Sequence, residues 1–162
     1  MTTLLSPPIV SGLAAARDAV GEAAQQPLWS LTDRQLAVEV AEALALRARA
    51  DAVLLARLGE ADARGLARTR GASSMVAWLR GTHRLAAGEA SRLVRTAEAL
   101  REQLPATAQA LADGQVNLGQ VEVIVDSLKD LSDEVSTAQR AEGEATLIGA
   151  CLLYTSPSPR DS

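Results

Sequence analysis

The sequence has very few aromatic residues. Among its 162 residues there is no Phe, one Tyr and two Trp. Strands are enriched in aromatic and β-branched side chains, so this composition disfavours a sheet. Alanine, the strongest helix former, is instead abundant, with 32 residues. The sequence therefore predicts an all-α fold, a multi-helix bundle with a core of Ala, Leu and Val in which Trp78 anchors the central part.

Cysteine and histidine are equally scarce, with one residue of each. Disulfides and Cys/His metal sites need several such residues. No apolar run approaches the roughly 20 residues that a membrane-spanning helix requires. The N-terminus, MTTLLSPPIVSG, lacks the basic residues and the uninterrupted apolar stretch of a secretion signal. We expect a cytoplasmic bacterial protein with no cofactor and no membrane partner, and the sequence identifies no small-molecule ligand.

The C-terminal run CLLYTSPSPRD matches a transposase sequencing adapter translated in one frame. We therefore expect the reading frame to be truncated near Ala150. The sequence is therefore divided into three regions: an N-terminal lead and short helix over 1–30, a helical domain over 31–150 and a non-native tail over 151–162. Because Cys151 lies in this tail, the natural part is expected to have no thiol. The tail is expected to add nothing to stability.

Capping residues and hydrophobic periodicity predict most helices. Thr32 and Gln35 form a capping box before a helix of about thirty residues, from Asp33 to about Arg64. Its length favours packing within a bundle over one half of a coiled pair. A basic, mobile connector is expected over 65–71. Further helices are expected over about 9–25, over 105–112 with Pro105 in the first turn and Gly114 after its end, over 117–130 with Asn117 and Gln120 as caps, and from Ser132 onward.

The stretch from Gly71 to Leu104 predicts two helices joined by a glycine turn. Ser73 or Ser74 caps a short helix that reaches Arg80, and Gly81 ends it in a left-handed conformation. A second helix runs from about Ala87. Its apolar residues recur at three- and four-residue steps and form one buried stripe. The stripe comprises Ala87, Ala90, Leu93, Val94, Ala97, Leu100 and Leu104.

Charge is distributed unevenly along the chain, although the net charge is only −4. Residues 1–63 hold five basic and eight acidic side chains, residues 64–101 hold eight and two, and residues 102–150 hold two and nine. The middle segment is therefore strongly basic. Such asymmetry bears on partners rather than on the fold. It agrees with nucleic-acid binding, and equally with acidic flanks that neutralise the basic segment within the same bundle.

The two central helices resemble a DNA-binding helix-turn-helix, in which the second helix carries arginines to phosphates or base edges. The predicted link from Gly81 to Ala86 is longer than the usual turn. An ordinary helical hairpin with solvated arginines is the alternative, because short motifs of this kind often occur by chance. The predicted nucleic-acid-binding residues are Arg80, Arg84, Arg92 and Arg95.

Three stretches together resemble a known family. The segments GASSMVAWL, EASRLVRTAEAL and LPATAQALADGQVNLGQVEVI are similar in spacing to the domain of unknown function 222. The resemblance extends from about Asp33 to Ala150. Members form a helical region that often precedes an HNH endonuclease module in GC-rich bacteria. The resemblance implies an association with DNA-cleaving proteins and assigns no role to the domain itself.

The catalytic site of an HNH nuclease cannot be assembled from these residues. Such a site needs paired histidines and usually a divalent metal, whereas this chain has only His83 and a single Asn, Asn117. We therefore predict no catalytic, metal-binding or cofactor-binding residues and no enzyme activity for this fragment. The expected function is a non-catalytic accessory region of an HNH endonuclease-like protein that associates with double-stranded DNA. The alternative is a structural or self-association module, forming a homo-oligomer, that positions a missing downstream catalytic domain.

Overall fold

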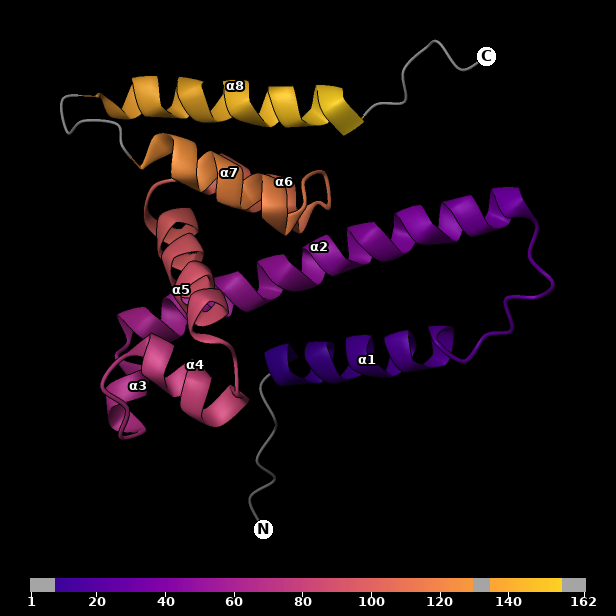
Figure 1. Ribbon diagram of the computed structural model, residues 1–162, viewed down its shortest axis with the longest axis horizontal. Helices are drawn as coiled ribbons and strands as arrows, with labels where there is room; N and C mark the ends of the chain where they lie inside the picture. The colour runs from indigo at the N-terminus through magenta and orange to yellow at the C-terminus, as the bar shows by residue number, and fades with distance from the viewer. Residues whose placement is uncertain (1–7, 130–134, 156–162) are drawn as a thin grey trace. The chain divides into compact units, whose positions relative to one another are not determined.

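The structure is a computed structural model that describes residues 8–129 and 135–155 (Figure 1). These residues form helices and no strands, which confirms the predicted all-α fold. No helix in this part of the chain is long and apolar enough to span a membrane. The helices are α1 (Pro8–Ala23), α2 (Asp33–Ala63), α3 (Leu66–Thr69), α4 (Met75–His83), α5 (Ala87–Glu102), α6 (Pro105–Ala112), α7 (Leu118–Leu128) and α8 (Thr137–Thr155).

The predicted capping boxes at α2 and α7 are confirmed. The backbone N–H of Thr32 donates to Gln35 Oε1 at 2.9 Å, and the N–H of Gln35 donates to Thr32 Oγ1 at 3.3 Å. Asn117 and Gln120 exchange the same two bonds at 2.9 and 3.0 Å. Each box satisfies N–H groups that have no partner within the helix. The local sequence therefore predicts where both helices start.

Helix α6 begins and ends as the sequence predicts. Pro105 occupies its first turn, where a missing N–H is harmless. At its end Gly114 has φ 74°. The N–H of Gln115 donates to Ala110 O at 2.9 Å and that of Gly114 to Leu111 O at 3.0 Å. These two bonds form a Schellman motif, which requires the left-handed backbone that glycine adopts without strain.

The predicted end of the short central helix is wrong. Gly81 lies inside α4, which continues to His83, and Arg84 adopts the left-handed conformation with φ 58°. The added residues bring the ring of His83 to 4.8 Å from that of Trp78 and let Leu85 pack against the core. These contacts offset the low helix propensity of glycine, about 1 kcal/mol relative to alanine.

The expected mobile connector contains a short helix, α3. Its Ala67 is 4% exposed, and Thr69 Oγ1 donates to Leu66 O at 2.8 Å. The connector is therefore a packed turn. The expected start of the last helix, Ser132, lies outside the described residues. Helix α8 begins after Ser136, which exchanges hydrogen bonds with Gln139 at 3.0 and 3.2 Å.

The chain divides into two compact units, residues 1–40 and residues 41–162, with the boundary inside α2. In the first unit α1 exposes 44% of Leu13 and 46% of Val20. In the second unit α5 contacts α4, α6 and α7, while α8 lies along α6 and α7 (Figure 1). Among the most deeply buried side chains of this unit are Leu55, Leu111, Val116, Val121 and Ile124.

The large rings contribute less to this core than the sequence suggests. Trp78 is only partly buried, although it packs against the aliphatic core as expected, and Trp29 is 88% exposed. Small residues allow close packing instead. A Cβ added to Gly59 would lie 3.1 Å from the carbonyl oxygen of Ala97, so α2 and α5 approach closely there. The core therefore consists mainly of aliphatic side chains between closely packed helices, with Trp78 at its edge.

Helix α8 connects the adapter-like run to the rest of the second unit. It continues past Ala150 to Thr155. Cys151 is partly buried and packs against the core. That the tail adds nothing to stability stays a prediction. Earlier in α8, Glu144 is 2% exposed and accepts hydrogen bonds from the backbone N–H and Oγ1 of Thr107 at 2.6 and 2.7 Å. This carboxylate of α8 caps the first turn of α6.

Candidate nucleic-acid interface

Helices α4 and α5 form a compact helix, turn and helix unit. Ser74 caps α4 by accepting a hydrogen bond from the N–H of Ala77 at 3.1 Å. Because α4 runs to His83 and α5 starts at Ala87, the link between them is Arg84 to Ala86. A link of about three residues has the length of a helix-turn-helix turn. The structure thus removes the mismatch in link length that the sequence suggested.

The buried face of α5 follows the predicted stripe except at Ala87, which is exposed, and at Val94, which is only partly buried. Ala90, Leu93, Ala97 and Leu100 are all buried. Thr96 is also fully buried and was not predicted, and its hydroxyl has no hydrogen-bond partner in the described structure. Packing therefore uses a wider face of the helix than apolar periodicity alone indicated.

Two of the four predicted DNA-contacting residues are engaged within the bundle. Arg92 lies 3.8 Å from Glu122, and Arg95 lies 3.3 Å from Asp126, so both arginines of α5 pair with carboxylates of α7. The partners are partly exposed, and such pairs contribute only about 0 to 1 kcal/mol of stability. Their main effect is to neutralise the outer face of α5.

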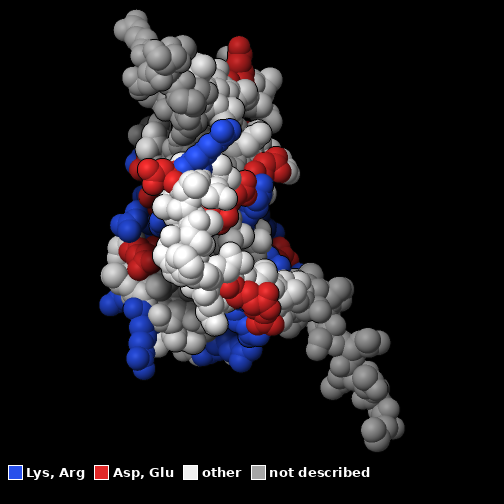
Figure 2. All heavy atoms as spheres, turned by 90° about the vertical axis from the view of Figure 1, so that its right-hand side faces the viewer, with Lys and Arg blue, Asp and Glu red and all other residues white. Residues whose placement is uncertain are grey.

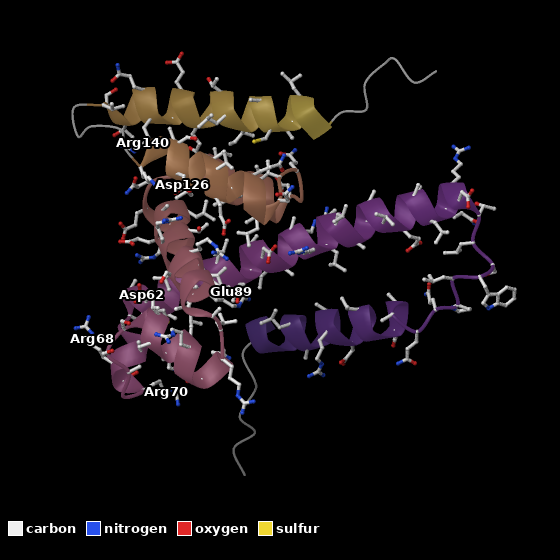
Figure 3. The ribbon with its side chains drawn as sticks, viewed as in Figure 1. Asp62, Arg68, Arg70, Glu89, Asp126 and Arg140 are labelled. Atoms are coloured by element: carbon white, nitrogen blue, oxygen red, sulfur yellow. The ribbon has the colours of Figure 1, made fainter. Side chains whose placement is uncertain are left out.

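Within residues 64–101, all of which the structure describes, four other arginines have no carboxylate partner: Arg68, Arg70, Arg80 and Arg84. We call them the α3–α4 arginines. All four are exposed, and Arg68 and Arg70 extend away from the α3 ribbon in Figure 3. Figure 2, which views the molecule from the right-hand side of Figure 1, shows basic side chains interspersed with acidic ones, several of them near the lower edge. The exposed cationic surface therefore lies before α5 rather than on it.

Arg64 and Arg101 are excluded from this set because they pair with Glu60. Arg64 Nε lies 2.6 Å from one Glu60 oxygen, and Arg101 lies 3.7 Å from the other. The hydrogen bond and charge of Arg64, with a smaller contribution from Arg101, lower the pKa of Glu60. Glu60 therefore carries its negative charge between the two guanidinium groups and reduces their attraction for a phosphate.

The two residues considered for nuclease chemistry have local roles. Asn117 uses its side-chain oxygen to cap α7, and His83 lies edge-on against Trp78. Within residues 8–129 and 135–155, no group of three or more His, Cys, Asp or Glu side chains is arranged to hold a metal ion. The geometry thus offers surface charge as the feature with which this unit could bind a partner.

The sequence indicates which of the paired charges share a helix face. Arg92 and Arg95 are three residues apart on one helix, and Glu122 and Asp126 are four apart on another. Such spacings place two charges on one helix face. The sequence could not show that these two helix faces meet, because α6 separates α5 from α7 along the chain. Arg68 and Arg70 were assigned to a mobile connector and so were not considered.

The fold and this surface define an all-helical domain with a basic helix, turn and helix unit. No curated protein and no solved structure matches the chain. The chain belongs to the family described as Domain of unknown function (DUF222), which matches residues 16–158. The match begins before and ends after the region expected from the resemblance, Asp33 to Ala150, and includes all of α2 to α8.

Proposed function

We propose that this chain is a non-catalytic accessory region that associates with double-stranded DNA next to an HNH endonuclease module. The observation that carries the proposal is the set of exposed α3–α4 arginines without carboxylate partners. Arginine binds phosphate through a planar fork of N–H donors, and phosphate contacts supply most of non-specific DNA affinity. The resemblance to DUF222 proteins that precede HNH modules supports the DNA-cleaving context.

The proposed contacts differ from those that a recognition-helix interpretation would use. A helix-turn-helix places its second helix in the major groove, whereas Arg92 and Arg95 of α5 already pair with Glu122 and Asp126. A phosphate would have to compete with these carboxylates for both arginines. Arg80 and Arg84 require no such exchange. We therefore propose sequence-independent contacts to the DNA backbone, with Arg68 and Arg70 added to the interface.

Replacing the α3–α4 arginines together by Gln is expected to abolish most DNA binding. Each phosphate contact adds about 0.9 to the slope of log affinity against log salt. Four contacts would therefore make the affinity of the unmodified chain fall about a hundredfold between 50 and 200 mM salt. The measurement is fluorescence anisotropy of a labelled duplex, titrated with the full chain at several salt concentrations.

The matched control is the double variant Arg92→Gln, Arg95→Gln, which removes two exposed arginines from α5. Its affinity and salt slope should remain close to those of the unmodified chain. The proposed interface is wrong if this double variant abolishes binding while the fourfold variant retains it. The unmodified chain failing to bind duplex even at 50 mM salt would reject DNA association altogether.

Self-association is the second candidate, and the exposed aliphatic residues of α2 favour it. Leu44, Leu46 and Leu54 are 60, 46 and 45% exposed. If these residues form an interface between copies, the mass measured by light scattering should rise with concentration. Leu44→Glu should then lower it to the monomer value. A monomer at every concentration tested would reject this candidate.

A further inference from the structure

A groove with apolar walls opens between α2, α3, α4 and α5. Its volume is about 440 Å³. The walls include Leu58 of α2, Trp78 of α4, Leu85 of the α4–α5 turn and Leu93 of α5. Pockets of this size with mostly apolar walls and a few polar groups are typical of small-molecule sites. None of the α3–α4 arginines lines this groove.

The few polar groups of the groove favour an anion. Among the described residues that line it, only Arg57, His83 and Trp78 have side-chain N–H groups, and none is acidic. Arg57 Nη1 donates to the carbonyl oxygen of Val53 at 3.2 Å in its own helix. Since a guanidinium has five N–H donors, most of its donors remain available to a ligand.

Arg57 differs from Arg64 and Arg101 in its ion pairing. Arg64 and Arg101 pair with Glu60, whereas Arg57 has no ion pair in the described part of the chain. An arginine is permanently charged and binds carboxylates through two parallel hydrogen bonds. A carboxylate at Arg57 would leave the rest of its molecule facing the apolar walls. The guanidinium of Arg57 and the apolar walls are therefore complementary to a ligand that has both a carboxylate and an apolar chain.

We propose that this groove binds a free monocarboxylic acid with an unbranched apolar chain, such as a medium-chain fatty acid. The carboxylate pairs with Arg57, and the chain lies on Leu58, Trp78 and Leu93. The volume of about 440 Å³ equals about fifteen groups of the size of a water molecule, taken as roughly that of a methylene. An acid of about ten carbons therefore fits with part of the groove left open to solvent.

Trp78 makes binding directly observable. The chain has two Trp residues, and the other, Trp29, is 88% exposed and outside the groove lining. In a Trp29→Phe background we expect decanoate to change the emission of Trp78 in a saturable way. Octanoate should bind about fifteenfold more weakly, because each buried methylene contributes about fourfold. Decanol, which lacks the charge, should bind at least about threefold more weakly than decanoate.

The variant Arg57→Gln tests how much the charge contributes to affinity, separately from the apolar contacts. Decanoate should then bind about as weakly as decanol, while the affinity for decanol should be unchanged. Arg34→Gln is the matched control, since Arg34 is another exposed arginine of α2 that does not line the groove, and it should leave decanoate binding unaltered. Ala61→Phe, which fills the groove, should abolish the emission change, with circular dichroism confirming that the variant folds.

Two results would overturn the proposal. The first is an emission of Trp78 that shows no saturable response to decanoate. The second is equal affinity for decanoate and decanol in the chain that retains Arg57. Neither result depends on DNA binding, which is measured separately and involves none of the substituted residues.

Discussion

Replacing Glu144 by Leu is expected to lower the free energy of unfolding by about 3 kcal/mol. The carboxylate is 2% exposed and accepts both hydrogen bonds that Thr107 donates into the interior. Leucine would leave the N–H and hydroxyl of Thr107 buried without an acceptor, and each unsatisfied group costs about 1 to 3 kcal/mol. The loss of a negative charge at the N-terminus of α6 adds to the effect.

Urea denaturation measures this change, with Glu142→Leu as the matched control. Glu142 is an exposed carboxylate two residues away on the same helix, and its replacement should change stability by less than about 0.5 kcal/mol. Adding Thr107→Val to Glu144→Leu removes the orphaned hydroxyl and should recover part of the loss. Equal stability of the two leucine variants would show that the carboxylate does not hold α8 to α6.

Replacing Gly114 by Ala is expected to cost about 2 to 4 kcal/mol, which combines backbone strain with a steric clash. Its φ of 74° disfavours any residue with a Cβ. The added Cβ would also lie 3.2 Å from the carbonyl oxygen of Ala45 and 3.3 Å from its Cβ. Those atoms belong to the rigid helix α2, so they cannot easily move away.

Gly71 provides the control for this substitution. It also ends a helix with positive φ, at 77°, and accompanies the same pair of hydrogen bonds after α3. An added Cβ there meets nothing within 4 Å. Gly71→Ala should therefore cost only the backbone strain, about 1 to 2 kcal/mol. Thermal unfolding of both variants compares the costs, and equal losses would mean that α2 does not approach the α6–α7 turn closely.

The predicted and the observed binding surfaces differ in which arginines remain available to a ligand. The basic segment of the chain is residues 64–101. Within that segment, however, Arg95 pairs with Asp126, whereas Arg80 has no carboxylate partner among the described residues. The two look alike in sequence, because each is an exposed arginine on an amphipathic helix. Their difference arises from the helix that lies beside each one.

The sequence by itself determined the helical class and most helix boundaries. Alanine content and the scarcity of aromatic residues disfavoured a sheet, and Thr32, Pro105 and Asn117 started helices as expected. These signals succeed because capping bonds join residues about three positions apart, within reach of a local pattern. The buried stripe of α5 was likewise predictable from the period of the helix.

Only the tertiary structure decided the roles of residues that act across the chain. Glu144 was one of several acidic side chains near the C-terminus until packing placed it against Thr107, 37 residues earlier. The left-handed conformation expected at Gly81 is found at Arg84, because α4 continues to His83, whose ring contacts that of Trp78. Burial and ion pairing depend on which helix faces come together, and a local pattern does not encode that choice.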